Sequence, residues 1–419
     1  MLRLQTRAEL IVQIETFNDG VSRDDVPTKT LSFLDKSVPN SSNGRTINFV
    51  GVVTCGNEIV LFLPKGMKPA TTQMQARLLY ECISSYERTE NVGWKNKPES
   101  DISIPLGIKV LEDYKRQGIY SVISKEFSRN FGGKINWAKT IRDVRPFISK
   151  SNVPIYAPPI VVRKTPTSDI IVNIHKAIVA EADRQLCWLV SKNGNPVAPH
   201  LIKHVLKFSK AKAIGLLRNE LARQYEDGKV AQLQLMIDYL QQMALQSEQS
   251  GWRLGTTNFQ VLWEKICSVV FGDQLDKFPI PAVPAYQAEG HRTSRPENAP
   301  RPDIVISDYK KIAIIDAKYY DFAKSKPSWA DMVKQFFYAK AYGLKYPSKE
   351  IKNIFAVPEC NDISAKSVVV INNDNVLLDS EFPPINILYL NVDEMIKLFN
   401  KRKKGNDLRL SAFESTNAN

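Results

Sequence analysis

Apolar residues recur along the chain with two spacings, and these spacings predict where strands and helices lie. Two strand-like runs, 47–53 and 58–63, flank the turn-prone segment 54–57, which predicts a β-hairpin. A helix is predicted over 71–85, where the apolar residues share one face. The N-terminal part of the chain is therefore expected to be mixed α+β.

A basic block follows between residues 105 and 165. A helix is predicted to end at Gly118, with Lys115 and Arg116 in its last turn. After a glycine turn, Lys134, Lys139 and Arg142 alternate with aromatic and apolar residues. This pattern predicts either a short strand that presents the three cations to phosphates, or a loop with solvated cations and a core tryptophan at 137. The pattern does not separate these two interpretations.

The middle of the chain, 168–250, has apolar residues at helical spacing over 169–189, 201–223 and 229–246. Such stripes most often form a core. The segment is expected to be a helical connector between two functional halves.

The remaining residues, 251–419, alternate between helical and strand patterns. The expected elements, in order, are a helix at 258–271, an irregular proline-rich stretch at 278–302, two strands around Asp303 and Asp316, a helix at 328–344, a strand at 354–357, a hairpin at 367–378, a strand at 386–390 and a helix at 392–400. This order is typical of an α/β domain. The basic segment 401–404 is expected to be solvated.

Composition narrows the class of protein. Hydrophobic residues make up 43% of the 419 positions, and no apolar run is long enough to cross a membrane. The first residues lack the apolar region of a secretory signal, and the five scattered cysteines form no Cys-x-x-Cys pair. His200 and His204 lack the pattern of a zinc site. We therefore expect a cytoplasmic protein that does not bind a membrane.

The net charge of +13 favours a polyanionic partner. Charge alone does not separate nucleic acid from an acidic membrane surface. Because the sequence shows no membrane-binding helix and no lipidation signal, nucleic acid is the expected partner. The residues expected to bind it as DNA are Lys115, Arg116, Lys134, Lys139 and Arg142.

Candidate chemistry lies at the end of one apolar run. Ile312–Ile315 leads directly into Asp316, Ala317 and Lys318, and Asp303 starts the strand before it. Strand side chains alternate between faces, so Asp316 and Lys318 should point the same way. Mg²⁺ prefers a few hard oxygen ligands, which Asp303, Asp316 and the carbonyl of Ala317 can supply. Lys318 could orient a water or neutralise charge at phosphorus, which is the set of groups that phosphodiester hydrolysis needs.

Two further residues could support this site. Glu264, on the helix before the strands, could complete the metal shell, and Gln335, on the helix after them, could hold Lys318 or a water in place. Taken alone, each is more often a surface residue. An isolated Asp-x-Lys is also a weak signal, which the upstream Pro302-Asp303 and the apolar run strengthen.

These residues resemble the signature of the PD-(D/E)XK nuclease superfamily, written here as Pro302-Asp303 and Asp316-Ala317-Lys318. The sequence around these residues is similar to that of the LlaJI-type restriction endonucleases, which are related to McrC. The segments that carry this resemblance are 259–267, 316–319 and 331–338, with weaker likeness at 62–66 and 133–141.

The resemblance implies a type II/IV-like restriction endonuclease that cuts double-stranded DNA with Mg²⁺, or Mn²⁺ in its place. It implies Asp303, Asp316 and Lys318 as the catalytic centre, supported by Glu264 and Gln335, in a nuclease domain at 251–419. Residues 1–167 would bind DNA or a partner. A McrB-type AAA+ NTPase is the implied partner, and the chain itself has no Gly-x-x-x-x-Gly-Lys-Ser/Thr loop.

Three alternatives stay open: a DNA-binding protein with a vestigial nuclease fold, a scaffold for an NTPase ring, and an RNA nuclease. The oligomeric state, a homo-oligomer included, also stays open.

Overall fold

The computed structural model describes most of the chain. The described residues are 14–37, 44–56, 58–90, 103–130, 132–166, 169–191, 193–245, 251–287, 296, 299–322, 324–360 and 365–414. Contacts divide the chain into a first unit, 1–104 with 248–419, and a second unit, 105–247. The predicted boundary at 167/168 falls inside the second unit. The fold is mixed α/β with several sheets.

The N-terminal part of the first unit is built on a four-stranded sheet. Its elements are β1 (Ile14–Asn18), α1 (Thr28–Ser37), β2 (Val50–Cys55), β3 (Glu58–Leu63), α2 (Thr72–Glu90) and β9 (Gly251–Thr256). The strand order is β1-β3-β2-β9, with β2 and β3 antiparallel, which confirms the predicted hairpin; Asn57 of its turn lies outside the described residues. Strand β9 was not predicted, because its partner β2 lies about two hundred residues away in sequence.

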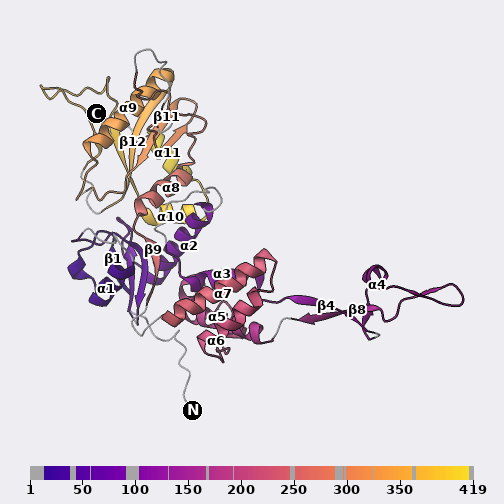
Figure 1. The fold of residues 1–419 in the computed structure, drawn as a ribbon. Helices are drawn as coiled ribbons and strands as arrows, with labels where there is room; N and C mark the ends of the chain where they lie inside the picture. Colours follow the sequence, from indigo (N-terminus) through magenta and orange to yellow (C-terminus); the bar gives the residue numbers. More distant parts are fainter. Residues whose placement is uncertain are drawn as a thin grey trace. The chain divides into compact units, whose positions relative to one another are not determined.

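The C-terminal part of the first unit is built on a five-stranded sheet (Figure 1). Its strands are β10 (Ile304–Ser307), β11 (Lys311–Ala317), β12 (Glu350–Pro358), β13 (Ser367–Val368) and β14 (Ile385–Leu390), in the order β10-β11-β12-β14-β13. Strands β10 and β11 form an antiparallel hairpin, and β11, β12 and β14 run parallel. The parallel strands end at one edge of the sheet, where the candidate residues lie.

Helices cover both faces of this sheet. They are α8 (Phe259–Phe271), α9 (Trp329–Lys345) and α11 (Asn406–Glu414), while α10 (Val392–Asn400) packs on α8 and α2. Ile312 and Ile314 of β11 pack against Tyr338 and Tyr342 of α9, while α8 and α11 also contact β11. The predicted helices correspond to α8, α9 and α10, and the left-handed Gly272 ends α8 as expected.

The C-terminal segment differs from the sequence prediction. The four basic residues 401–404 are exposed, as expected, but α11 follows them and buries Ala412 and Phe413. The short amphipathic pattern of α11 is too weak to be read from sequence.

The second unit has a helical part and an extended arm. The helices are α3 (Leu106–Gln117), α5 (Asp169–Val190), the 3₁₀ turn η3 (Pro199–Leu201), α6 (Lys210–Leu221) and α7 (Asp227–Leu245). The predicted helix at 201–223 was wrong at its start, because the Ser209 side chain caps α6 by accepting the Lys212 N–H. In the described part of the chain, no helix is long and apolar enough to span a membrane.

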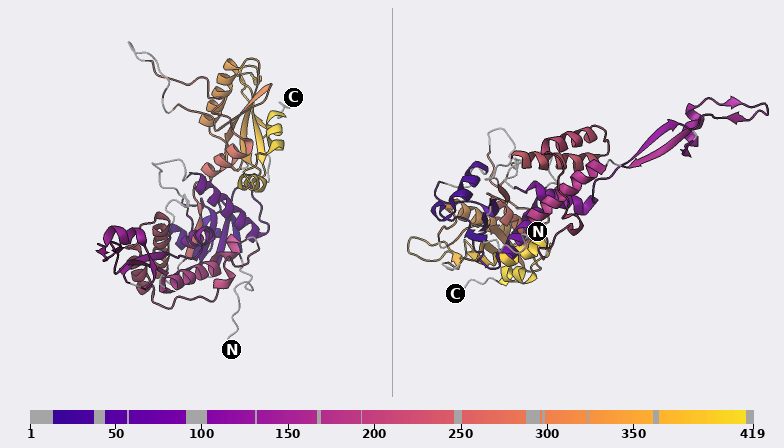
Figure 2. Two further views of the ribbon diagram at one scale, coloured as in Figure 1. Left: turned by 90° about the vertical axis from the view of Figure 1, so that its right-hand side faces the viewer. Right: turned by 90° about the horizontal axis from the view of Figure 1, so that it is seen from below.

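The arm comprises residues 123–166 and projects from the helices of the second unit (Figure 2). Its elements are β4 (Ile123–Arg129), β5 (Lys134–Ile135), α4 (Trp137–Asp143), β6 (Phe147–Ile148), β7 (Pro154–Ile155) and β8 (Ile160–Pro166). Strands β4 and β8 form an antiparallel ribbon, and β6 pairs with β7. The interpretation of Trp137 as a core residue was wrong, because its side chain is 56% exposed.

Candidate functional site

The β10–β11 hairpin brings the two predicted carboxylates together. The register pairs Ile304 with Ile315, so Asp303 lies across from Asp316 at the open end of the hairpin. The carboxylate of Asp303 accepts the backbone N–H of Ala317 at 2.9 Å. The site is therefore built at the end of a largely buried hairpin, and the Asp303 carboxylate fixes the backbone of Ala317.

Lys318 points to the same side as Asp316, as the strand alternation predicted. Its Nζ lies 2.9 Å from Asp316 Oδ2 and 2.9 Å from Asp331 Oδ1. Its backbone N–H donates to the carbonyl of Ala356 on β12 at 2.9 Å. The ammonium is thus fixed between two carboxylates, with the backbone anchored to the neighbouring strand.

Asp331 is a site residue that the sequence reasoning missed. It is the third residue of α9 and forms a capping box with Ser328, in which each side chain bonds the other's backbone N–H. Burial opposes ionisation of Asp331, but the hydrogen bonds from Ser328 and Lys318 outweigh it and hold its pKa below the ordinary value. The Ser-x-x-Asp pattern predicts a helix cap, and nothing local to it indicates the contact with Lys318.

Asp303, Asp316 and Glu264 repel one another when they are ionised. Burial, followed by the negative charge of Asp316, raises the pKa of Asp303 to about 7, although the Ala317 N–H and Lys318 act in the opposite direction. The pKa of Glu264 is also raised, by partial burial of its carboxyl group and by Asp316, against the lowering effect of Lys318. The charges of Asp316 and Lys318 therefore act on Glu264. The Glu264 side chain as a whole is nevertheless exposed on α8.

Lys318 stays protonated in this arrangement. Burial opposes its charge, but Asp316 and Asp331 outweigh burial and raise the pKa of Lys318 above its usual value. A charged lysine can donate hydrogen bonds and neutralise an anion. It cannot act as a base.

Gln335 has a different role from the one expected. It is buried, and its Nε2 donates to the carbonyls of Ile314 at 3.1 Å and Ile354 at 3.3 Å. The amide thus joins β11 to β12 beneath the site and donates to these carbonyls, not to a group that holds Lys318. One turn on, Tyr338 donates to the carbonyl of Arg301 at 3.1 Å and so fixes the segment that enters Asp303.

Tyr319 connects the end of β11 to the N-terminal sheet. Its hydroxyl accepts the backbone N–H of Lys65 at 2.8 Å and hydrogen-bonds to the carboxylate of Asp19. The Lys65 ammonium lies 4.8 Å from the centre of the Tyr319 ring. Next to it, Gly66 has a φ of +78°, and an added Cβ would lie 2.6 Å from the carbonyl oxygen of Glu359. The two sheets of the first unit therefore meet beside Lys318.

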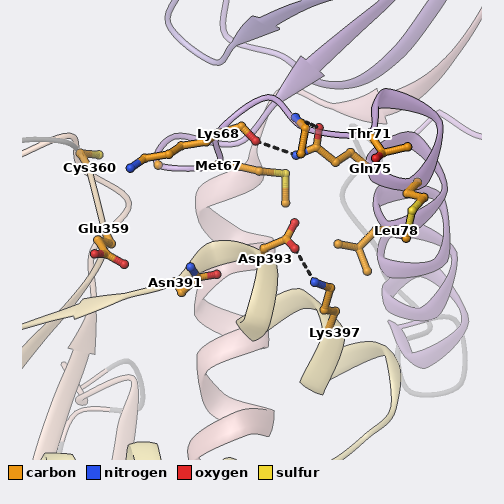
Figure 3. Close-up of a pocket in the computed structure, with 13 residues that line it drawn as sticks. Met67, Lys68, Thr71, Gln75, Leu78, Glu359, Cys360, Asn391, Asp393 and Lys397 are labelled. Carbon is orange, nitrogen blue, oxygen red and sulfur yellow. Dashed lines mark hydrogen bonds and ion pairs between the residues drawn. The ribbon is translucent and has the colours of Figure 1, made fainter.

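A hollow of about 620 Å³ lies near this contact (Figure 3). It is bordered by the segment 66–71 and α2 on one side, and by Glu359 and the start of α10 on the other. Gln75 closes one wall by accepting the Ala70 N–H and donating to the Lys68 carbonyl. None of the predicted site residues lines this hollow, so the chemistry is argued from the strand ends alone.

The oxygen atoms at the end of the hairpin decide which kind of metal ion could bind there. Among the described residues, no group of three or more His, Cys, Asp or Glu side chains forms a metal-binding cluster. Mg²⁺ needs only one or two carboxylates and takes its remaining ligands from water and substrate phosphate. Burial and then the charge of Asp316 raise the pKa of Asp303. This pair of carboxylates is enough for Mg²⁺ bound in this open way, but too few for a site in which protein groups supply all the ligands.

The predicted DNA-binding residues all lie in the second unit. Lys115 and Arg116 are exposed at the end of α3, where Arg116 pairs with Asp113 at 3.0 Å. Lys134, Lys139 and Arg142 lie on the arm. The structure thus places them on two separate elements of that unit.

Two of the arm residues already have partners. Arg142 pairs with Asp143 at 2.7 Å, while Lys139 is 4.0 Å from Asp143 and 4.5 Å from the Phe127 ring centre. Their charge is therefore partly neutralised within the arm, whereas Lys134 is exposed. The expected role of all five residues in DNA binding stays a prediction.

Fold and site together define a mixed α/β protein with a lysine–carboxylate centre at the end of a parallel sheet. Residues 49–393 match the model of the LlaJI restriction endonuclease family, and the chain belongs to that family. It is 23% identical, over 406 residues, to the type II restriction enzyme BsuMI component YdjA of Bacillus subtilis (strain 168), covering 87% of this chain and 83% of the relative.

A solved structure is also similar to this chain. It is the refined half-complex from the tetradecameric assembly of Thermococcus gammatolerans McrB AAA+ hexamers with bound McrC. The identity is 14%, the coverage is 93% of this chain and 99% of the matched chain, and the TM-score is 0.43. A likeness at that level does not establish a common fold.

Proposed function

We propose that this chain is the DNA-cleaving subunit of a bacterial restriction system, with a PD-(D/E)XK centre that hydrolyses phosphodiester bonds with Mg²⁺. The observation that carries the proposal is the ion pair between Asp316 and Lys318 at the end of β11, across from a half-buried Asp303. Membership of the LlaJI restriction endonuclease family supports it. A site with these groups has no evident packing role.

Lys318 is suited to stabilise the reacting phosphate. An ammonium has three N–H donors, and two carboxylates engage Lys318. A donor therefore remains for a phosphate oxygen, whose negative charge grows as phosphorus is attacked. Because the lysine is held from both sides, it needs little reorganisation to act.

Asp303 and Asp316 would hold the cation, with Glu264 at the edge of the site. The bound Mg²⁺ would polarise the phosphate and lower the pKa of the attacking water. The role expected of the Ala317 carbonyl stays a proposal, and the Ala317 N–H supports it only by fixing the backbone against Asp303.

The arm of the second unit supports a protein partner for the nuclease. Its tip exposes Phe147, Ile148, Val153 and Ile155, which is a larger apolar surface than isolated residues make. Residues 123–166 also carry nine lysines and arginines against two acidic residues. We infer that the arm contacts an acidic protein surface, and an AAA+ NTPase of the McrB type is the partner that the family resemblance implies.

Plasmid cleavage tests the proposed activity. The full chain, with and without a neighbouring AAA+ protein and nucleoside triphosphate, is incubated with supercoiled plasmid and Mg²⁺. We expect cleavage by the unmodified chain, and a loss of at least about 100-fold in Asp316→Asn and Lys318→Met. Asp276→Asn and Lys277→Met, at exposed positions of the same unit, are matched controls.

The outcomes separate the alternatives. DNA binding without cleavage under every condition would establish a vestigial nuclease, and preference for RNA in competition would replace the DNA assignment. Full cleavage by either site variant would show that the centre lies elsewhere.

A further inference from the structure

Two carboxylates hold the Lys318 ammonium, and they hold it in different ways. Asp331 Oδ1 accepts a hydrogen bond from Lys318 Nζ at 2.9 Å. Asp316 Oδ2 lies at the same distance from Nζ as an ion pair, but this buried oxygen accepts no well-aligned hydrogen bond from the described residues. Asp316 Oδ2 therefore keeps lone pairs that a cation can use, although an ammonium lies beside it.

Asp331 is fixed by contacts that do not involve the sheet. Its Oδ2 accepts the Ser328 hydroxyl at 2.6 Å and the Ser328 backbone N–H at 3.1 Å. It lies in the first turn of α9, where the helix dipole favours a negative charge. Its side chain is only 18% exposed, so water screens its attraction to Lys318 incompletely. The carboxylate of Asp331 is therefore held in place independently of Asp316.

A cation bound at Asp316 would compete with Lys318. The ammonium and a divalent cation are both positive and both interact with the Asp316 carboxylate, so each weakens the binding of the other. If Asp316 were its single partner, Lys318 would either exclude the cation or leave the centre. A second carboxylate on another element removes this conflict, because it neutralises the ammonium while Asp316 binds the cation.

We propose that Asp331 is a positioning residue that holds Lys318 at the reacting phosphate while Mg²⁺ occupies Asp316, so that the lysine and the cation act together. Lys318 exchanges its contact with Asp316 for one with a phosphate oxygen, and its hydrogen bond to Asp331 stays. This inference rests on the proposed function and deepens it, because it names the group that controls access of the cation to Asp316.

A double-mutant cycle on Mg²⁺ binding tests this role. Isothermal titration calorimetry, without DNA, measures the affinity of the full chain for Mg²⁺ in the unmodified chain, Asp331→Asn, Lys318→Met and the double variant. Asp331→Asn should weaken Mg²⁺ binding about 10-fold more when Lys318 is present than in the Lys318→Met chain, because only an ammonium paired with Asp316 competes with Mg²⁺. The lost charge of Asp331 also acts directly on Mg²⁺, but it does so in both chains and cancels in the cycle.

Plasmid cleavage at saturating Mg²⁺ gives a second measurement. Asp331→Asn should lower kcat about 10-fold and leave KM for DNA within about 2-fold, because Lys318 acts on the reacting phosphate. Asn391→Ala is the matched control for loss of a helix cap, since Asn391 caps α10 of the same unit by accepting the Glu394 N–H at 3.0 Å. This control should leave Mg²⁺ affinity and kcat unchanged. Circular dichroism confirms that each variant is folded, and Asp331→Asn keeps a side-chain oxygen that can accept the Ser328 N–H.

The possible results separate this inference from the proposed function. If the unmodified chain binds Mg²⁺ and cuts plasmid, but Asp331→Asn weakens Mg²⁺ binding equally in both chains or not at all, the role of Asp331 is wrong and the proposed function stands. An unchanged kcat in Asp331→Asn would also overturn that role. If the unmodified chain neither binds Mg²⁺ nor cuts DNA, both are overturned.

Discussion

Removing the hydroxyl of Tyr319 tests how the two sheets of the first unit are joined. In Tyr319→Phe the ring still packs near Lys65, but the backbone N–H of Lys65 loses its acceptor and Asp19 loses a donor. A buried donor left unsatisfied costs about 1–3 kcal/mol, and a hydrogen bond to a charged group contributes about 1.5–3 kcal/mol. We expect the variant to be destabilised by about 2–4 kcal/mol at pH 8.

The loss should depend on pH. Burial raises the pKa of Asp19 to about 6, against the lowering effects of Lys65 and Tyr319. The folded state therefore holds the Asp19 proton more tightly than the unfolded chain, and stability falls as pH rises through about 6. Without the Tyr319 hydrogen bond the folded pKa rises further. The variant should lose more stability at pH 8 than at pH 5, where Asp19 is protonated and its bond to Tyr319 is weaker.

The assay must separate the two units of the chain. Urea unfolding followed by pulsed hydrogen exchange and mass spectrometry reports residues 58–90 and 304–322 apart from residues 105–247. Tyr309→Phe is the matched control, because Tyr309 is 92% exposed and should tolerate the change within about 0.5 kcal/mol. A destabilisation below about 0.5 kcal/mol for Tyr319→Phe, or one equal at both pH values, would refute the reasoning.

Three further changes are tested by the same unfolding measurement. Gly66→Ala should destabilise the first unit by about 1–3 kcal/mol because of its positive φ and the nearby carbonyl, whereas Gly132→Ala, with open space around it, should have little effect. Gln335→Met removes the bridge between β11 and β12 and should cost about 1–3 kcal/mol, with little change if that bridge is unimportant. Asp303→Asn should stabilise the metal-free chain by on the order of 2 kcal/mol at pH 8 and by less at pH 5, because the raised pKa of Asp303 makes its charge costly only at the higher pH. The same change should abolish any stabilisation of the chain by Mg²⁺. A larger stabilisation at pH 5 than at pH 8 would contradict the raised pKa of Asp303.

Local sequence signals predicted the elements that carry the site. The apolar run before Asp316, the alternation of strand side chains and the Ser328 cap each act over a few residues, and the structure has β11, the Asp316–Lys318 pair and α9 where these signals place them. A hairpin also brings its two ends together, so the proximity of Asp303 to Asp316 followed from its short loop.

Contacts between distant segments could not be predicted in this way. The bond between Lys65 and Tyr319 joins residues separated by 254 positions, and strand β9 completes a sheet formed by residues near the start of the chain. Asp331 is closer in sequence to its partner Lys318. The Ser-x-x-Asp pattern, however, is fully explained by the helix cap and does not indicate the contact with Lys318. Similarly, Gln335 was expected beside Lys318 because its helix flanks the site, and only the packed sheet shows that it faces two backbone carbonyls.

Asp303 is the residue whose presence is hardest to explain by folding alone. Its structural contact is the hydrogen bond accepted from the Ala317 N–H, and the side-chain oxygen of an asparagine could accept the same bond. An asparagine would avoid the burial of a charge next to Asp316, which raises the pKa of Asp303 to about 7. The carboxylate therefore costs stability near neutral pH and adds nothing to the fold that an amide lacks. A negative charge at that position suits the cation that we propose binds there. This half-buried acid, more than the Asp-x-Lys pattern, is therefore the residue that supports the proposed metal-dependent centre at the end of β11.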